Sequence, residues 1–388
     1  MDYIERAITP ALLERAASYP AVFVTGPRQS GKSTLVRHAF PNHTYISLEE
    51  PDVRRFAVED PRGFLHQYGE QVILDEAQRA PELFSYLQTR IDEHDSTGMY
   101  ILSGSQNFLM MDSISQSLAG RVGILNLLPF SLSELDEGGY PPSSSERWMI
   151  QGAYPRAITM GISPDIFYAD YLQTYIERDV RNETTVRDLA RFRDFLTACA
   201  AKVGSLINLT NIGRDIGADA RTVSSWLSIL EESYICFRLT PYYSSVGNRH
   251  TKNAKLYFYD TGLLCYLLGI ATEPELSASA YIGNVFENAV IAEKSKQYLN
   301  SGKKPSMFFW RDSASKEKEI DLIIESAHNH IDLYEIKASM TSNRSYLDTM
   351  LKFAARSNSS CAINVIYRGQ DQLSSDGPSF INWRSLGG

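Results

Sequence analysis

A glycine-rich stretch near the N-terminus has the residue types that bind phosphate. It follows a G-x-x-x-x-G-K-S pattern and consists of Gly26, Pro27, Arg28, Gln29, Ser30, Gly31, Lys32, Ser33 and Thr34. Glycines permit backbone angles that a Cβ forbids, so consecutive N–H groups can surround phosphate oxygens. Lys32 would reach the β- and γ-phosphates, and the Ser33 hydroxyl would bind Mg²⁺. The stretch therefore predicts a site for ATP with Mg²⁺.

An acidic pair supplies the second half of such a site. The apolar run Val72-Ile73-Leu74 ends in Asp75 and Glu76. At the carboxyl end of a strand beside the phosphate loop, one carboxylate can hold the Mg²⁺ shell and its neighbour can polarise the attacking water. We assign Asp75 to Mg²⁺ and Glu76 to the water. The alternative is that both acids only cap the following helix.

A third polar stretch follows the apolar run 100–102. It contains Ser105 and Asn107, either of which would be placed to sense the γ-phosphate. The same residue types begin ordinary helices as N-caps, so both interpretations stay open.

A second group of charged residues lies near the C-terminus. Two strand-like runs, 319–324 and 332–337, flank a turn at 327–329. A three-residue loop there would place Asp321 opposite Glu335, and Asn329 would tolerate its left-handed position. Glu335 and Lys337 are two residues apart on one strand and so share a face. We expect Asp321, Glu335 and Lys337 to converge.

The elements that must position the phosphate loop follow an α/β pattern. Short apolar runs alternate with helical patterns at Ala21–Val24, Thr44–Leu48, Gln71–Leu74, Met99–Leu102 and Val122–Leu127. This alternation is typical of a parallel sheet covered by helices on both faces. The phosphate loop would lie between the first strand and a helix, whose N-terminus favours anions.

Between residues 189 and 243 the pattern changes to short helices. Apolar residues recur at helical spacing over 189–203, and Thr210 and Asp219 begin two further helices. Two apolar runs, 234–239 and 241–243, follow them, so we predict a winged helix-turn-helix. Residues 186–240 hold 7 Lys and Arg against 6 Asp and Glu. Because DNA-reading helices usually carry more positive charge, DNA contact and a purely structural, lid-like role both stay open.

Taken together, these motifs resemble the AAA-superfamily ATPases of bacteria and archaea that carry a C-terminal domain of unknown function. The stretches that carry the resemblance are GPRQSGKST at 26–34, LDEAQRAPELF at 74–84, ILSGSQNF at 101–108, SLAGRVGILNLLPFSLSEL at 117–135, YIERDV at 175–180 and KLYFYDTGLL at 255–264. The resemblance implies a homo-oligomer in which an arginine of a neighbouring subunit completes the site. Arg121 and Arg178 are the candidates, and each would serve equally as a structural ion-pair partner.

The C-terminal charged residues resemble the restriction-endonuclease-like nucleases, in the branch with G-x-x-x-E, then D, then E-x-K. The resemblance implies that Asp321 and Glu335 hold Mg²⁺, that Lys337 positions or activates the water, and that Glu287 completes the site from its helix. Mg²⁺ prefers carboxylates, and phosphodiester hydrolysis benefits from a metal that stabilises the charged transition state. The alternative is a degenerate fold that only retains the acids.

These interpretations divide the chain of 388 residues into three parts. We expect an AAA-type P-loop ATPase domain with its linker over 1–185, a winged helix-turn-helix segment over 186–245, and an α/β restriction-endonuclease-like domain over 246–388. The first 185 residues hold 15 Lys and Arg against 25 Asp and Glu, so the net charge of −8 belongs to the ATPase part.

Composition limits the compartment and the partners. The chain shows no apolar run long enough to span a membrane and no signal-peptide pattern, and its four cysteines are far apart. We expect a cytoplasmic protein that does not bind membranes. The predicted function is Mg²⁺-dependent ATP hydrolysis coupled to action on DNA, including cleavage by the C-terminal domain. The alternative is a nucleotide-dependent switch or assembly protein whose C-terminal domain binds a partner without catalysis.

Overall fold

The computed structural model describes residues 3–94, 96–105, 117–176, 188–242, 254–312, 318–375 and 377–387. Within these residues, five parallel strands form one sheet in the order β2-β3-β4-β1-β5. The strands are β1 (Ala21–Thr25), β2 (Thr44–Ser47), β3 (Val72–Asp75), β4 (Tyr100–Gly104) and β5 (Val122–Asn126). All five lie where the apolar runs predict them.

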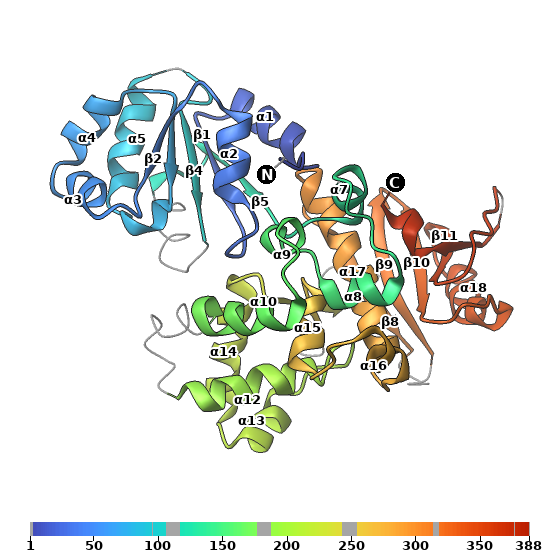
Figure 1. Cartoon of the computed structure of the whole chain (residues 1–388). Helices are drawn as coiled ribbons and strands as arrows, with labels where there is room; N and C mark the ends of the chain where they lie inside the picture. The colour runs from blue at the N-terminus through green and yellow to red at the C-terminus, as the bar shows by residue number, and fades with distance from the viewer. Residues whose placement is uncertain are drawn as a thin grey trace.

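Helices cover both faces of this sheet (Figure 1). They are α1 (Thr9–Ser18), α2 (Lys32–Ala39), α3 (Pro51–Glu59), α4 (Pro61–Tyr68), the short η1 (Ala77–Arg79) and α5 (Leu83–Glu93). Since successive residues of a strand point to opposite faces, Val22 packs with Leu35 of α2, whereas Phe23 packs with Leu87 of α5. The doubly covered parallel sheet is therefore as predicted.

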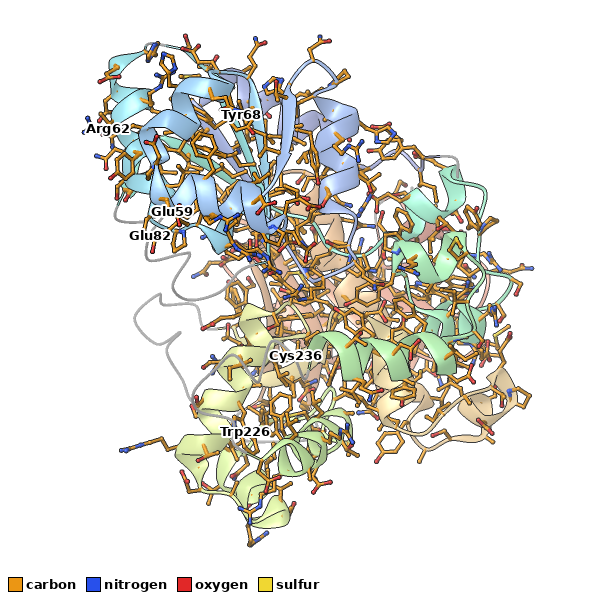
Figure 2. All side chains as sticks on the ribbon, turned by 60° about the vertical axis from the view of Figure 1, so that its left-hand side comes forward. Glu59, Arg62, Tyr68, Glu82, Trp226 and Cys236 are labelled. Carbon is orange, nitrogen blue, oxygen red and sulfur yellow. The ribbon has the colours of Figure 1, made fainter. Side chains whose placement is uncertain are left out.

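A helical region follows the sheet. Its elements are α7 (Leu132–Glu137), α8 (Ser145–Gln151), α9 (Pro155–Thr159), α10 (Pro164–Tyr171), the π-helical η2 (Leu172–Ile176), α12 (Leu189–Ala200), α13 (Leu209–Ile216) and α14 (Ala220–Glu232). The last three are the helices predicted in the middle segment. Trp226 of α14, labelled in Figure 2, packs against Phe192 and Phe195 of α12. Gly217 ends α13 with φ 69°, and Asp219 caps α14.

The second sheet contains, among the described residues, seven strands in the order β12-β11-β10-β9-β8-β6-β7. They are β6 (Cys236–Pro241), β7 (Lys255–Phe258), β8 (Met307–Arg311), β9 (Glu319–Ala327), β10 (His330–Lys337), β11 (Ser360–Tyr367) and β12 (Ser379–Asn382). The accompanying helices are α15 (Thr261–Leu267), α16 (Glu273–Ala278), α17 (Ile282–Asn300), η4 (Arg344–Leu347), α18 (Asp348–Ala354) and η5 (Trp383–Leu386).

The two apolar runs predicted at 234–239 and 241–243 do not form two separate strands in the described residues, which end at residue 242 here. A single strand, β6, spans residues 236–239 of the first run and residue 241 of the second, since one residue between the runs is too few for a hairpin turn. β6 pairs antiparallel with β7 and parallel with β8. The expected boundary after residue 245 therefore falls between two strands of one sheet.

Helix α17 lies between the two sheets, as Figure 1 shows. Its inner face is buried, and Val285, Phe286 and Ile291 belong to the large core that also contains α12, α14 and β9 residues. One rigid helix therefore contacts the second sheet and approaches the end of the first. Among the described helices, none combines the length and the apolar character that crossing a membrane requires.

Candidate functional site

The predicted phosphate loop connects the end of β1 to the start of α2. Gly31 has φ 94° directly before α2, and Gly26 has φ 150° directly after β1. A Cβ on Gly26 would lie 2.1 Å from the carbonyl oxygen of Leu127. Both glycines are therefore required by the geometry that turns the strand into the helix N-terminus.

Lys32 lies inside this loop. Its Nζ donates hydrogen bonds to the carbonyl oxygens of Gly26 at 3.0 Å and Pro27 at 2.8 Å, and the residue is only 7% exposed. The ammonium group is thus held by the backbone carbonyl groups of the loop itself. Ser33 and Thr34 follow in the first turn of α2.

Asp75 ends β3 at the same level of the sheet as the start of the loop. Asp75 and Val24 both pair with Ser103 of β4, so one strand separates the carboxylate from β1. The Asp75 carboxylate accepts hydrogen bonds from Tyr45 at 2.6 Å and from Ser103 at 2.5 Å. Burial, and then the bond to Asp75, raise the pKa of Tyr45 well above its usual value. The hydroxyl groups hold Asp75 in one orientation.

Glu76 follows Asp75 in a left-handed conformation with φ 54° and makes no capping hydrogen bond to the described part of the next helix. The helix-capping alternative therefore does not account for Glu76. Instead, Nε2 of Gln78 donates to Oε2 of Glu76 at 2.5 Å and to Oγ of Ser105 at 3.0 Å. Gln78 links two of the predicted site residues and was missed by sequence reasoning. In the fold, Gly104 leaves room for Gln78, since a Cβ there would lie 2.0 Å from Gln78 Oε1.

Of the two candidate arginines, Arg121 and Arg178, the structure describes only Arg121. β1 and β5 are parallel, with Ala21 opposite Val122. Arg121 directly precedes β5, whereas the phosphate loop directly follows β1, so the two lie at opposite ends of these strands. Arg121 therefore lies at the opposite edge of the sheet, about 16 Å from the loop for a five-residue strand. It pairs with Asp92 at 2.6 Å, and that hydrogen bond raises its pKa. Arg178 lies outside the described residues.

A cavity of about 540 Å³ lies beside the loop, within the size range of small-molecule sites. Its walls come from the loop, the N-terminal segment and α9, and the lining residues are Tyr3, Ile4, Arg6, Gln29, Gly31, Thr34, His38, Phe130, Pro155, Arg156, Thr159 and Met160. The Tyr3 and His38 rings stack with centroids 3.8 Å apart. Arg156 is exposed in this wall. Sequence reasoning missed it because α9 is distant along the chain.

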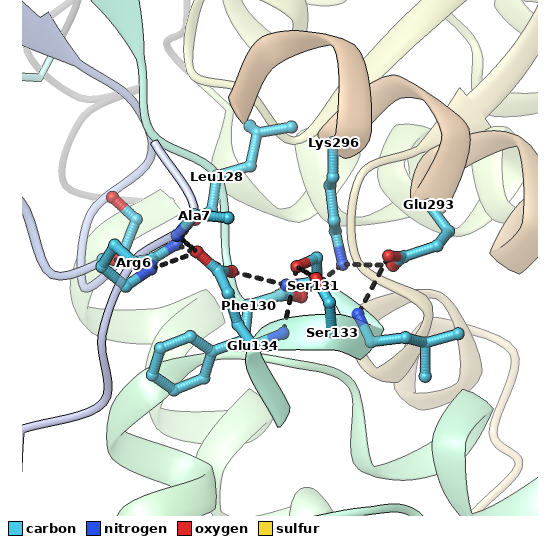
Figure 3. A network of polar contacts seen from close by, with 11 residues as sticks. Arg6, Ala7, Leu128, Phe130, Ser131, Ser133, Glu134, Glu293 and Lys296 are labelled. Carbon is cyan, nitrogen blue, oxygen red and sulfur yellow. Dashed lines mark hydrogen bonds and ion pairs between the residues drawn. The ribbon is translucent and has the colours of Figure 1, made fainter. Parts of the chain in front are cut away.

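A buried polar network around α7 connects Arg6 to α17, as Figure 3 shows. Arg6 donates to the carbonyl oxygen of Ser30 at 2.7 Å and pairs with Glu134 of α7 at 2.8 Å. On the other side of α7, Lys296 of α17 donates to the carbonyl oxygen of Phe130 at 2.8 Å. The N–H of Leu132 donates to Glu293 of α17 at 2.9 Å. The phosphate loop and α17 thus share a contiguous set of contacts through α7.

The C-terminal residues converge, although the turn between their strands differs from the prediction. Ala327 pairs with His330, so the loop has two residues, and Asn329 has the expected left-handed φ of 57°. A β-bulge after His330 restores the predicted register, and the last paired residues, Leu322 and Tyr334, are followed by Asp321 and Glu335. The N–H of Ile336 donates to Asp321 at 2.8 Å.

Lys337 lies next to both acids. Its Nζ is 2.5 Å from Oε1 of Glu335 and 3.6 Å from Oδ2 of Asp321. Burial, and then the Asp321 charge, raise the pKa of Glu335 to about 7, against the opposing effect of Lys337. The buried Oε2 of Glu335 has no hydrogen-bond partner among the described residues. A hydrogen-bond donor or a cation could therefore still bind this oxygen.

Glu287 reaches the same place from α17. Its Oε1 accepts hydrogen bonds from Tyr257 at 2.5 Å and from Lys255 at 3.2 Å, both on β7. Burial, and then the Asp321 charge, raise the pKa of Glu287 to about 7. Lys255 and Tyr257 were not predicted as site residues. The sequence feature that could have indicated Lys255 is its charge at the start of the otherwise apolar strand 255–258.

Asp321 and Glu335 together fit Mg²⁺ as a site with two carboxylate ligands. Among the described residues, no three or more His, Cys, Asp and Glu side chains are arranged to hold a metal ion. Mg²⁺ is usually bound by one or two carboxylates, with water and phosphate oxygens as its other ligands. Asp321 and Glu335, with its unpaired Oε2, satisfy that requirement.

One face of α14 is partly exposed. Arg221 and Ser224 are exposed, and Thr222 and Ser225 are half-buried. Asp219 accepts hydrogen bonds from the N–H groups of Arg221 and Thr222. This face presents small polar side chains with a single positive charge.

The chain is similar to curated proteins without an assigned function. An uncharacterized protein of Mycobacterium tuberculosis is 28% identical over 344 residues, which cover 87% of this chain and 75% of that protein. An uncharacterized protein of Haemophilus influenzae is 22% identical over 305 residues, which cover 70% of this chain and 73% of that protein.

Solved structures show weaker similarity. The Walker-type ATPase PABY2304 of Pyrococcus abyssi matches with a TM-score of 0.46 and 16% identity, over 69% of this chain and 96% of that chain. AMPPCP-bound DnaA from Aquifex aeolicus matches with a TM-score of 0.30 and 18% identity, over 58% of this chain and 86% of that chain.

Three family models match separate parts of the chain. Residues 143–274 match a domain of unknown function (DUF8612), and residues 282–386 match another (DUF4143). Residues 18–136 match the model described as an AAA domain. That range contains the phosphate loop, Asp75, Glu76 and Gln78, so the match supports an AAA-type ATPase domain that binds and hydrolyses nucleotide.

Proposed function

We propose that the chain is a Mg²⁺-dependent ATPase whose nucleotide site controls a second site that acts on DNA. The observation that carries the DNA part is the convergence of Asp321, Glu335 and Lys337 at the ends of β9 and β10. A divalent ion bound there would stabilise the charge that develops on a phosphodiester during hydrolysis. Lys337 orients the attacking water, and Glu287 approaches the site from α17, where Lys255 and Tyr257 hold it.

In the nucleotide site, the loop backbone holds the phosphates and Lys32 exchanges two carbonyl oxygens for phosphate oxygens. Ser33 and Asp75 are the residues that hold Mg²⁺. Glu76 orients the attacking water, and Gln78 holds Glu76 in place. The cavity beside the loop receives the base and ribose, with Arg156 in its wall.

A neighbouring copy would complete this site. Arg121 lies far from its own loop, so its contribution would have to be made to the site of another subunit. We therefore propose a homo-oligomer in which Arg121 or Arg178 reaches across the interface.

The buried network supports coupling between the two sites. Arg6 contacts the loop carbonyl of Ser30 and Glu134 of α7, and α7 contacts Glu293 and Lys296 of α17. Glu287 lies on the same helix, six residues before Glu293, or about 9 Å along its axis. A nucleotide that shifts Ser30 would thereby act on the position of Glu287.

The test separates the two activities by substitution. Lys32→Ala should abolish ATP turnover, because the charge that reaches the phosphates is lost. Asp321→Ala should leave turnover intact and abolish DNA cleavage. DNA cleavage by the Asp321→Ala variant would show that the C-terminal site is wrongly assigned, whatever the result for Lys32.

A second candidate is a nucleotide-dependent switch that binds a protein partner without cutting DNA. It is favoured by the two lysines that already neutralise the C-terminal carboxylates, Lys255 and Lys337. Such a switch should turn over ATP at the same slow rate with and without DNA.

A further inference from the structure

Lys255 is the deeply buried cation of the C-terminal site. It begins β7, a strand whose residues are all buried, and its side chain is only 2% exposed. Its Nζ pairs with Glu287 at 3.2 Å and with Glu319 of β9, and lies 5.5 Å from the centre of the Phe309 ring. With carboxylates on two sides and an aromatic face on a third, the ammonium group is enclosed by the fold.

Lys337 is placed differently. Its side chain is 34% exposed, and it approaches the acids from the solvent side, with the Tyr346 ring 5.9 Å away. Lys337 can therefore leave Asp321 and Glu335 when another cation enters. Lys255 cannot move away from Glu287 and Glu319 in the same way. Its charge would then stay buried without a partner, or β7 would have to separate from the sheet.

Glu287 is committed to β7. The same oxygen, Oε1, accepts from both Lys255 and Tyr257, and these donors are two residues apart on one face of the strand. The cation beside Glu335, in contrast, is the partly exposed Lys337, and the buried Oε2 of Glu335 has no partner among the described residues. A divalent ion that displaces Lys337 would therefore lie between Asp321 and Glu335.

We propose that Lys255 is a built-in cation of this site, which holds Glu287 out of metal coordination and limits the site to one divalent ion between Asp321 and Glu335. This inference rests on the proposed function, because it presupposes that the site takes a divalent ion. Lys255 is a positioning residue, and a second divalent ion beside Glu287 would be repelled by the ammonium group that already neutralises Glu287 and Glu319.

The experiment counts Mn²⁺ ions bound to the full chain without nucleotide, from the paramagnetic resonance signal of free Mn²⁺. An Asp321→Asn variant supplies the blank for ions bound elsewhere. The wild type should bind one ion more than the blank, and Lys255→Gln should bind two more. The exposed Lys352→Gln should match the wild type.

A second variant keeps the inference falsifiable if Lys255→Gln does not fold. Glu287→Gln should retain the single ion, because Glu287 is a partner of Lys255 and not a ligand. Two results would overturn the inference and leave the proposed metal site standing. One is that Glu287→Gln loses the single ion, and the other is that a folded Lys255→Gln binds only one ion more than the blank. Equal counts for the wild type and Asp321→Asn would overturn the metal site and the inference together.

Discussion

Arg6 and Glu134 form an ion pair that is almost completely removed from water, with Nε and Oε1 2.8 Å apart and side-chain exposures of 3% and 1%. The two residues are 128 positions apart in the chain. Glu134 also accepts hydrogen bonds from the N–H groups of Ala7 and Ser131, and Arg6 also donates to Leu128. The pair therefore joins the N-terminal segment, α7 and the phosphate loop.

Breaking this pair should be costly, because the remaining charge would stay buried without a partner. Arg6→Ala should lower the free energy of unfolding by about 3–5 kcal/mol, measured by urea denaturation. Arg55→Ala is the control, since Arg55 and Asp52 are exposed and their pair contributes about 0–1 kcal/mol. Equal effects of the two substitutions would contradict a buried, structural role for Arg6.

Glu76 and Gln78 should affect the chemical step more than nucleotide binding. Glu76→Gln should lower kcat by about 10² or more, since a positioned base contributes 10²–10⁴. Gln78→Ala should lower kcat by a smaller factor with little change in KM, because it only holds Glu76. Steady-state ATP turnover measures both. A rise in KM with constant kcat would assign these residues to binding instead.

Arg156 should contribute to nucleotide affinity, since it lines the cavity beside the loop. Arg156→Ala should raise KM for ATP by about tenfold, as expected for a lost hydrogen bond to a charged group. Arg121→Ala should leave KM unchanged, because Arg121 lies at the far edge of the sheet, and a fall in kcat there would reveal action across subunits. An unchanged KM in Arg156→Ala would place the nucleotide elsewhere.

The C-terminal acids should make stability depend on pH. Glu287 and Glu335 have folded-state pKa values of about 7, against 4.5 for the free side chain. Between those values the folded state binds more protons than the unfolded state, so the free energy of unfolding should fall as pH rises from about 4.5 to 7. Glu335→Gln should flatten this dependence, measured by urea denaturation at pH 5 and pH 8. An unchanged slope would show that Glu335 does not titrate there.

The nucleotide site was largely predictable because its parts are contiguous in the chain. The loop lies between a strand and a helix that directly flank it, and Asp75 ends an apolar run. The register that brings Asp321 to Glu335 was also predicted correctly, although the loop is shorter and a bulge compensates.

Contacts between distant segments were not predictable in this way. β6 pairs with β8, about 70 residues later, because backbone pairing depends on the tertiary fold and not on local pattern. Gln78, Arg156 and Lys255 reach their sites from elements whose neighbours only the fold determines. Lys255 in particular interrupts an apolar strand, a local conflict that often marks a functional position.

We propose that ATP turnover is coupled to action on DNA. The most direct measurement is ATP turnover with Mg²⁺, with and without single- and double-stranded DNA, while the DNA is followed on a gel. We predict that DNA raises turnover and is cut by the wild type but not by Asp321→Ala. Unchanged turnover with intact DNA would contradict this coupling and leave an ATPase whose C-terminal domain serves another partner.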